Sequence, residues 1–559
     1  MTTVRRSVKL IAVASAVLAA AVRCLYFADF AESSLANPGA GGHDRALYHR
    51  AAQEPFFPDR AFDHMPLYPW ALRLIYLATG PRAENAAYFG IACDAATAAL
   101  IALTAARLGA IPPVAALASL LYAMYPVAIA YSVQTMPNTL NAFATALFAW
   151  ISLRFKRQRT ASWLGLGLLA GTSALGWAAW LLMAPAWALA EALSARERSI
   201  PLRHLLAFAL AFAGPIAVVA VHNARIEGQF VGLTTHSGFN FYMGNHERAT
   251  GHPVRVRNFR MTAGALLEDA HRAAEEAVGR KLSRAESSAW WSEQAMKFWR
   301  ERPADALRLA LRKAVLVFHG VDVDDLRLVE LSQLLVGWFE SRWWPSFAWI
   351  GWAGLVGLAC ARGAGPLRSL AAAGVLSLVA MFITARYRLA LAPLFLGLGA
   401  AGLRRITDDF RAGRPRLSIV LALAALGIVF WPFQIPDQRP TDYANAAVHL
   451  MQANRAEEAL RMTDRGLAIR PNFAPLLHAR GEALFRLGAY REAAASFAAV
   501  LEVEPTHPLA AYNFALSLAR AGDVRAARDT LRAAAARRPL SESAAKLLAE
   551  LEASLSAAE

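Results

Sequence analysis

The chain is organised around a polar loop, GGHDRALYHRAAQEPFFPDRAFDHMPLYPW (residues 41–70), that follows an apolar run, VKLIAVASAVLAAAVRCLYFAD (residues 8–29). The apolar run is long enough to cross about 30 Å of hydrocarbon as a helix. The loop then carries Asp44 at the rim of the bilayer. A carboxylate is costly to hold there, so its presence indicates chemistry rather than packing.

The composition places the rest of the chain in a membrane. Of its 559 residues, 56% are hydrophobic and 18% charged, which is typical of a polytopic membrane protein. A net charge of +16 would indicate nucleic acid binding in a soluble protein. In a membrane protein the same arginines collect in cytoplasmic loops, so we expect no nucleic-acid partner. The three cysteines lie in apolar segments, which indicates neither a disulfide framework nor a zinc site.

About eleven apolar runs are long enough to be considered as membrane spans. They lie at residues 8–29, 84–106, 112–132, 138–154, 161–176, 177–193, 204–222, 345–362, 366–385, 387–403 and 416–433. The first lacks a clear cleavage site after it, so we expect an uncleaved span rather than a signal peptide. Arginine-rich loops between several spans should be cytoplasmic. Asp44, the outer loops 30–83 and 223–344, and the C-terminal tail then lie outside, while the amphipathic segment 307–319 lies along the interface.

The tail repeats with a period of 34 residues. This spacing separates three prolines (Pro471, Pro505, Pro539), three turn residues (Asn454, Gly488, Gly522) and three packing alanines (Ala459, Ala493, Ala527). The pattern predicts three tetratricopeptide repeats, which form a docking surface for a protein rather than a catalyst. The predicted fold class is therefore all-α: a polytopic membrane helical bundle over residues 1–435, followed by an α-solenoid over residues 438–559.

Three charged residues near the first span have alternative interpretations. Asp44 can cap a short helix that begins near Arg45, or act as a general base beside a membrane cavity, and the two roles are compatible. Asp94 lies within a predicted span, where a hydrogen bond between helices is favoured over contact with substrate. Arg23, near the outer end of the first span, can extend to the lipid headgroups.

Two further outer segments carry binding chemistry. The run THSGFNFYMGNH (residues 235–246) mixes amide and aromatic side chains, which suit sugar recognition, although a surface hairpin would use similar residues. Arg386, Tyr387 and Arg388 open the tenth predicted span on its outer side. The guanidinium group of an arginine can bind two phosphate oxygens at once. We therefore expect these residues to bind either an anionic lipid headgroup or a lipid-phosphate substrate. The histidines show no tight ligand spacing, so no metal site is predicted and a divalent metal is left open as a cofactor.

In their order along the chain, these features resemble the clan C glycosyltransferases of membranes. The likeness is to the bacterial branch of protein-mannosyltransferase-like and aminoarabinose-transferase-like enzymes, and it covers about residues 8–405. It is carried by the Asp44 loop, PLYP (66–69), Cys93-Asp94, GFNFYMGN (238–245), LRK (311–313) and ARYRL (385–389).

The resemblance implies an inverting transferase that takes its sugar from a polyprenyl-phosphate donor at the outer face of a bacterial inner membrane. A first-loop aspartate would act on the acceptor. The implied catalytic residues are Asp44, His43 and Asp63. The implied phosphate-binding residues are Arg386, Arg388, Tyr387, Arg312 and Lys313, and the implied sugar- or acceptor-binding residues are His64, Asn240, Tyr242 and Asn245. Membrane lipid and a protein docked on the repeats are the expected partners.

The chain departs from that family at two places. Many relatives have two adjacent acidic residues where this chain has His43-Asp44, and many have another carboxylate in the second outer loop. Here Gln134 to Asn138 supply only amides. The acid–base assignment therefore depends on Asp44, with Asp63 as a substitute in the same loop. The missing carboxylate favours one alternative, a non-catalytic membrane scaffold that recruits partners through its repeats. A separate alternative is a transporter or polymerase of lipid-linked glycans.

Overall fold

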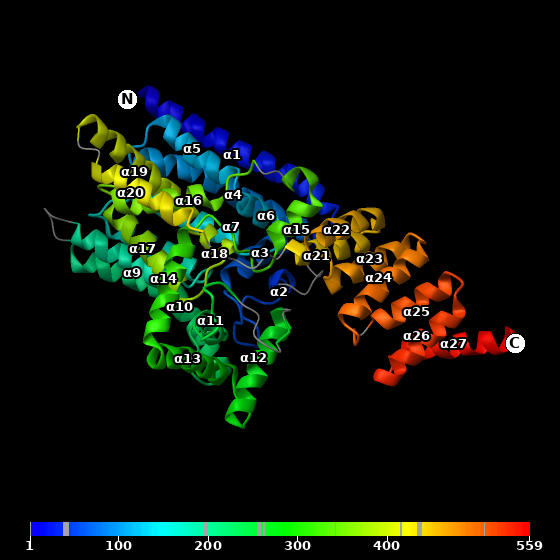
Figure 1. The fold of residues 1–559 in the computed structure, drawn as a ribbon. Coiled ribbons are helices and arrows are strands. Elements are labelled where there is room, and N and C mark those ends of the chain that lie inside the picture. Colours follow the sequence, from blue (N-terminus) through cyan, green and yellow to red (C-terminus); the bar gives the residue numbers. More distant parts are fainter. Residues whose placement is uncertain are drawn as a thin grey trace. The chain divides into compact units, whose positions relative to one another are not determined.

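The computed structural model describes residues 2–36, 44–194, 200–253, 259–260, 263–340, 343–413, 416–432, 439–507 and 509–558. Helices and no strands are found in these ranges (Figure 1), which confirms the all-α prediction. His43, one of the predicted catalytic residues, lies outside the described residues.

Two compact units make up the chain. The first comprises Met1–Ala28, Asn37–Val329 and Arg342–Pro432, and the second comprises Asp29–Ala36, Glu330–Ser341 and Phe433–Glu559.

The helices that precede the repeats in the chain are α1 (Thr2–Ala31), η1 (Ser34–Ala36), α2 (Asp44–Ala51), α3 (Leu67–Thr79), α4 (Ala83–Arg107), α5 (Pro112–Ala123), α6 (Pro126–Ser132), α7 (Asn138–Ser152), α8 (Thr160–Ala174), α9 (Trp180–Leu193), α10 (Leu202–Glu227), α11 (Ser237–Gly244), α12 (Ala263–Val278), α13 (Arg284–Glu301), α14 (Pro303–Phe318), α15 (Leu328–Leu335), η3 (Gly337–Glu340), α16 (Phe347–Cys360), α17 (Gly365–Ala380), α18 (Ala385–Leu389), α19 (Ala392–Arg411) and α20 (Arg416–Val429). The repeat helices are α21 (Arg439–Gln452), α22 (Ala456–Ile469), α23 (Ala474–Arg486), α24 (Tyr490–Val503), α25 (Ala510–Arg520), α26 (Val524–Arg537) and α27 (Glu542–Ala558).

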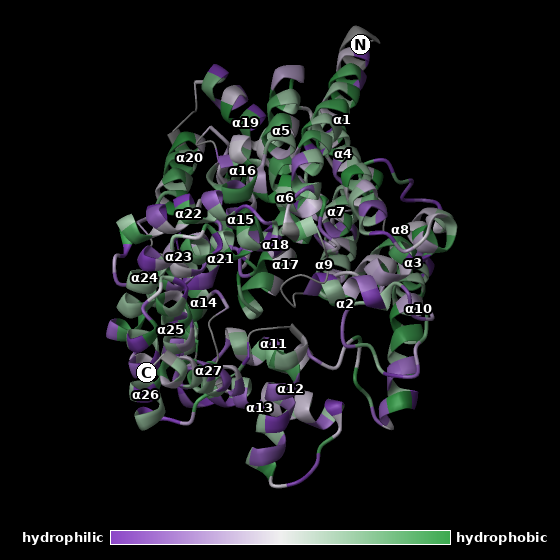
Figure 2. Ribbon diagram, turned by 90° about the vertical axis from the view of Figure 1, so that its right-hand side faces the viewer, coloured by the Kyte–Doolittle hydropathy of each residue, from purple (hydrophilic) through white to green (hydrophobic). Residues whose placement is uncertain are grey.

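Each predicted apolar run coincides with a helix or a pair of helices. In the described part of the chain, α1 (over Arg6–Ala31), α4 and α10 are long and apolar enough to cross a membrane. The pair α5 and α6, bent by 54° at a break before Pro126, makes a fourth span if it crosses as one. Figure 2 shows apolar residues along α1 and α20 and more polar ones along α13. Several spans are thus supported, and a total of about eleven stays a prediction.

Small residues allow the apolar helices to approach closely. Helices α16 and α19 pack together. A Cβ added at Gly357 would lie 2.6 Å from the backbone of Leu398, and one at Gly399 would lie 2.5 Å from Ala353. Such contacts between backbones are typical of helices that associate in a membrane, where burial of apolar surface supplies little driving force.

A buried ion pair joins the first helix to the helices beside it. The Arg23 side chain is 0% exposed and donates to the Asp94 carboxylate, and also to the carbonyl of Ala123 at 2.6 Å. The Tyr122 hydroxyl donates to the other oxygen of Asp94 at 2.5 Å. The prediction that Arg23 reaches the headgroups is wrong, because a buried carboxylate requires a compensating charge nearby. The predicted interhelical hydrogen bond of Asp94 is confirmed.

The tetratricopeptide prediction is also confirmed. Three helical hairpins, α21–α22, α23–α24 and α25–α26, are followed by α27. Asn454, Gly488 and Gly522 all have positive φ, at 61°, 79° and 91°, so the repeated position is the left-handed residue that ends the first helix of each pair. The alanines of the period are fully buried between the paired helices.

Removing one partner of the Arg23–Asp94 pair should destabilise the fold strongly. Asp94→Leu leaves a buried guanidinium without its carboxylate, at an expected cost of about 3–5 kcal/mol in the free energy of unfolding. The double variant Arg23→Met/Asp94→Leu should recover much of this loss. Denaturation of the detergent-solubilised protein measures both, and equal losses in the single and double variants would contradict the role given to the pair.

Candidate functional site

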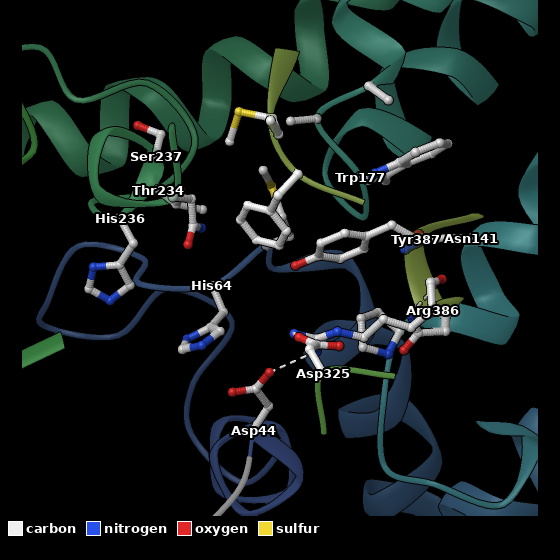
Figure 3. Close-up of a pocket in the computed structure, with 18 of the residues that line it drawn as sticks. Asp44, His64, Asn141, Trp177, Thr234, His236, Ser237, Asp325, Arg386 and Tyr387 are labelled. Carbon is white, nitrogen blue, oxygen red and sulfur yellow. Dashed lines mark hydrogen bonds and ion pairs between the residues drawn. The ribbon is translucent and has the colours of Figure 1, made fainter. Parts of the chain in front are cut away.

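The first unit contains a cavity of about 370 Å³, here called the main cavity. Segments far apart in the chain meet around it: the start of α2, the loop 63–65, the start of α7, the link between α8 and α9, helix α11, the loop before α15, the end of α17, and α18. Figure 3 shows its charged end, where Asp44, Asp325 and Arg386 lie close together, with Tyr387 beside them.

Arg386 is the centre of this charged end. Its Nη1 donates to Asp44 Oδ2 at 2.9 Å and its Nη2 donates to Asp325 Oδ2 at 2.7 Å. Helix α18 is capped at its start, because the Thr384 hydroxyl accepts from the Tyr387 N–H at 3.3 Å. The Asn138 side-chain amide donates to the Arg386 carbonyl at 3.1 Å. Backbone and side chain of Arg386 are therefore both fixed from several directions.

Asp325 is the charged cavity residue that the sequence analysis missed. It is one of three aspartates in VDVDD (residues 321–325), and these have different partners. Asp322 pairs with Arg388 at 2.6 Å, and Asp324 accepts from the Tyr131 hydroxyl at 2.7 Å and the Val329 N–H at 2.7 Å. Only Asp325 lines the main cavity. A dense acidic run next to the last outer spans is the signal that could have identified it.

The environment of Asp325 changes its acidity and its hydrogen bonding. Burial raises the pKa of Asp325 to about 6, an effect that Arg386 only partly offsets. Within the described part of the chain, its Oδ1 is buried without a hydrogen-bond partner. Asp325 therefore has one oxygen fixed on Arg386 and one oxygen to which a proton can bind near neutral pH.

Arg388 differs from Arg386, although the two were predicted to act together. Its guanidinium donates to the carbonyls of Leu316, His319 and Val321 at 2.7–3.1 Å and pairs with Asp322. Its side chain is 1% exposed and does not line the main cavity. These contacts hold the loop after α14 and do not support a role in binding phosphate.

Two more of the predicted binding residues bond to each other. Asn245 is fully buried, and its Oδ1 accepts from Lys313 Nζ and Trp299 Nε1, both at 3.1 Å. Burial lowers the pKa of Lys313 to about 7. Neither residue lines the main cavity, and Arg312 and Tyr242 also lie outside it. Asn245 and Lys313 thus join α14 to the segment after α11, and their predicted ligand contacts are not supported.

Asp63 and His64, as predicted, lie at the cavity, and they form part of a wall. Figure 3 shows His64 between Asp44 and His236. The His236 ring lies 3.5 Å from Asp63 Oδ1, which also accepts from the Thr235 hydroxyl at 2.8 Å. Burial lowers the pKa of His236 to about 4, so this ring is neutral at pH 7. A second cavity of about 300 Å³ lies beyond Asp63, His64 and His236.

The remaining lining divides into polar and apolar parts. Asn138, Asn141, Asn240 and Ser237 are polar. An apolar side, next to the start of α9 and the end of α17, is formed by Trp177, Ala178, Ala179, Leu378, Met381 and Phe382. Among the described residues no group of three or more His, Cys, Asp or Glu side chains is placed to hold a metal ion.

This combination defines a helical membrane protein with a cavity in its first unit and a repeat tail. Residues 63–222 match the family model of dolichyl-phosphate-mannose-protein mannosyltransferases, and residues 484–551 match that of tetratricopeptide repeats. The chain therefore carries a mannosyltransferase-family segment followed by repeats, in agreement with the resemblance seen in the sequence.

Solved structures give more distant similarities. The oligosaccharyltransferase AglB from Archaeoglobus fulgidus, with an inhibitory peptide and a dolichol-phosphate, is 13% identical at a TM-score of 0.35. The match covers 80% of this chain and 59% of that chain, so this chain spans less than two thirds of its length. The second repeat domain of human RPAP3 is 16% identical at a TM-score of 0.20, covering 21% and 98% of the two chains. Comparison with curated proteins gave no match.

The raised pKa of Asp325 predicts a pH-dependent stability. An unfolded aspartate loses its proton near pH 4, whereas the folded chain holds this proton to about pH 6. The folded state binds the proton more tightly, so the contribution of Asp325 to stability falls as pH rises from about 4 to 6, by about 3 kcal/mol at most. Thermal unfolding of the wild type should therefore lose more stability over this range than Asp325→Asn.

Asp305→Asn, on the exposed side of α14, is the matched control for that experiment. It should keep the pH dependence of the wild type. Parallel pH profiles for the wild type and Asp325→Asn would contradict the shifted titration of Asp325.

Proposed function

We propose that the protein is a membrane glycosyltransferase that moves a sugar from a polyprenyl-phosphate donor to a hydroxyl of an envelope glycan, lipid or protein. The observation that carries the proposal is Arg386 held between Asp44 and Asp325 at the end of the main cavity. A mannosyltransferase-family segment in the same chain supports it. The reaction is placed at the outer face of a bacterial inner membrane, since the positive-inside pattern puts the Asp44 loop outside.

Asp44 is assigned as the general base. Its carboxylate lines the main cavity, and the bond from Arg386 fixes its orientation. As the acceptor oxygen attacks the anomeric carbon, its proton passes to Asp44. The bond between the anomeric carbon and the phosphate oxygen breaks at the same time, and its electron pair stays on the phosphate. Attack opposite the leaving group inverts the configuration.

Arg386 is assigned to the leaving phosphate. A guanidinium that stays charged when partly buried can bind two phosphate oxygens and stabilise the charge that grows on them. Its two terminal nitrogens donate to the carboxylates of Asp44 and Asp325. Asp325 can release Nη2 of Arg386 when its carboxylate binds a proton, because the pKa of Asp325 is raised to about 6. Arrival of the phosphate would thus exchange one anionic partner of Arg386 for another.

The other residues that line the main cavity suit the sugar and the lipid tail of the donor. The buried Oδ1 of Asn138 has no hydrogen-bond partner among the described residues and can accept from a sugar hydroxyl. Asn240 and His64 add polar groups on the same cavity. The apolar side near Trp177 and Phe382 suits the first isoprene units of a lipid tail.

The alternative of a non-catalytic scaffold loses its main support. That alternative was based on the absence of a second carboxylate from residues 134–138. Gln134 accepts from Arg45 at 3.0 Å, which is a structural contact, and a second carboxylate bonded to Arg386 at the cavity is that of Asp325. No observation on the cavity favours a transporter or polymerase. The repeats keep a proposed role in docking a protein partner or acceptor.

Replacing the proposed base should stop the chemistry with little effect on donor binding. Asp44→Asn keeps the size of the side chain and an acceptor for Arg386, and loses the proton-accepting group. We expect kcat to fall about 10²- to 10⁴-fold with a nearly unchanged KM for the donor. Transfer from a radiolabelled polyprenyl-phosphate sugar in proteoliposomes measures this.

Asp63→Asn is the matched variant for that test, because Asp63 lines the same cavity without touching Arg386. It should retain most of the activity. Full turnover by Asp44→Asn together with loss of turnover in Asp63→Asn would move the base to Asp63.

Arg386→Lys should weaken the use of the donor. Lysine keeps the charge and loses the planar fork that can bind two phosphate oxygens, so we expect KM for the donor to rise about tenfold, together with a lower kcat. Arg312→Ala, on the exposed side of α14, should leave both parameters unchanged. If Arg312→Ala raised the donor KM and Arg386→Lys did not, the phosphate site would have to be placed at α14.

A further inference from the structure

The second cavity lies directly against the main cavity. Its volume of about 300 Å³ is at the lower end of the range for small-molecule sites, about 300–1,000 Å³. The wall between the two cavities consists of residues that line both of them: Tyr48, Asp63, His64, His236 and Leu267. This wall is therefore one side chain thick. Figure 3 shows His64 of the wall next to Asp44, so a molecule in the second cavity lies close to the proposed base.

The charged residues that line the second cavity are unequally paired. They are three arginines (Arg50, Arg60, Arg284) and three carboxylates (Glu54, Asp63, Glu268). Arg60 lies 2.6 Å from Glu54 and 3.4 Å from Asp63, and Glu268 lies 3.6 Å from Arg260. Each carboxylate thus has an arginine partner. In the described part of the chain, Arg50 and Arg284 have no carboxylate within ion-pair distance.

The position of Arg284 indicates an anionic ligand. Arg284 is the first residue of α13, where the positive end of the helix dipole disfavours a cation. The pKa values of His236 and His271 are lowered by burial, and the charge of Arg284 lowers them further. Positive potential is therefore concentrated here, and a bound anion would reduce it. Arg50, in the last turn of α2, lies at the favourable end of its helix, so its position alone does not indicate a ligand.

The second cavity also has an apolar side. This side includes four prolines and one tryptophan: Pro55, Pro58, Pro66, Pro69 and Trp70. The Trp70 indole is held in place, because its Nε1 donates to the Phe56 carbonyl at 2.6 Å. Apolar and aromatic surfaces of this kind can cover the C–H groups of a sugar ring. A guanidinium group can bind two oxygens of a phosphate or a carboxylate at once.

We infer that the second cavity binds the acceptor, and that the acceptor is an acidic glycan whose phosphate or carboxylate is bound by Arg50 and Arg284. The sugar ring lies against the prolines and Trp70, and the attacking hydroxyl reaches Asp44 beside His64. The inference rests on the proposed transferase function and adds the class of acceptor. Because donor and acceptor occupy separate cavities, the two arginines contribute to acceptor binding and not to donor binding.

Binding of small acidic sugars tests the inference without any transfer. The probes are glucuronic acid and glucose 6-phosphate, which carry a carboxylate and a phosphate, and glucose at matched ionic strength, which carries neither. Thermal unfolding of the full-length protein in detergent should show stabilisation by at least one acidic sugar at up to about 50 mM, and none by glucose. Stabilisation by only one of the two identifies the charged group of the acceptor.

Arg50→Gln and Arg284→Gln should each raise the apparent Kd of the acidic sugar about tenfold, because each loses charge-assisted hydrogen bonds. The double variant should abolish the stabilisation. Arg272→Gln is the matched control, since Arg272 is an exposed residue of α12 that pairs with Asp269 at 3.1 Å and lines neither cavity. It should keep the wild-type Kd.

Competition in native membranes tests the acceptor role. Transfer from a radiolabelled polyprenyl-phosphate sugar labels the acceptors already present there. The acidic sugar that binds should reduce this labelling, whereas glucose should not. In Arg50→Gln and Arg284→Gln, half-inhibition should require about tenfold more acidic sugar, with an unchanged KM for the donor.

Several results would overturn the inference. Equal stabilisation by glucose, or none by either acidic sugar, would show that the second cavity does not select an acidic sugar. Stabilisation that survives in the double variant, or is lost in Arg272→Gln, would place the anion elsewhere. Binding without reduced labelling would exclude the acceptor role. Absence of transfer by the wild-type protein would overturn the proposed function, and the acceptor role with it, while the unfolding data would still report on the binding of acidic sugars.

Discussion

The contact of Arg386 with two carboxylates is the constraint on which the candidate site depends. Its partners Asp44 and Asp325 are separated from it by 342 and 61 residues in the chain. Burial makes each of these charges costly alone, so the folded chain stabilises them by bringing the two carboxylates to the guanidinium. The cap at Thr384 and the bond from Asn138 fix the arginine. The geometry of the cavity thus follows from one shared guanidinium.

Helical geometry explains why neighbouring charges have different roles. With 3.6 residues per turn, positions i and i+2 point to nearly opposite sides of a helix. Arg386 and Arg388 in α18 therefore cannot both face the main cavity, and Arg388 turns to Asp322 and three backbone carbonyls. Asp325 faces the cavity while Asp324 caps α15. In each of these two pairs, one residue thus lines the cavity and its neighbour of the same type fixes a loop.

The pair of Arg23 and Asp94 shows that a charge inside the membrane region is not functional merely because it is costly. That pair is fully buried, and neither residue lines the main cavity. Arg386 meets its carboxylates at a cavity with room for a ligand, and Asp325 keeps an oxygen without a partner in the described part of the chain. Access to a cavity, together with a titratable group, separates a site from a structural pair.

Local patterns were enough to predict the helices and the repeats, and to select Asp44 and Arg386 as candidate site residues. Apolar length and a 34-residue period depend on neighbours within a turn or a repeat, so the sequence alone determined them, as the positive φ of Asn454 illustrates. The tertiary structure decided which polar residues meet. It brought Asp325 to the cavity and paired Asn245 with Lys313 instead of a ligand. Such partners are distant in the chain, and only the packing of whole helices and loops determines which side chains share a space.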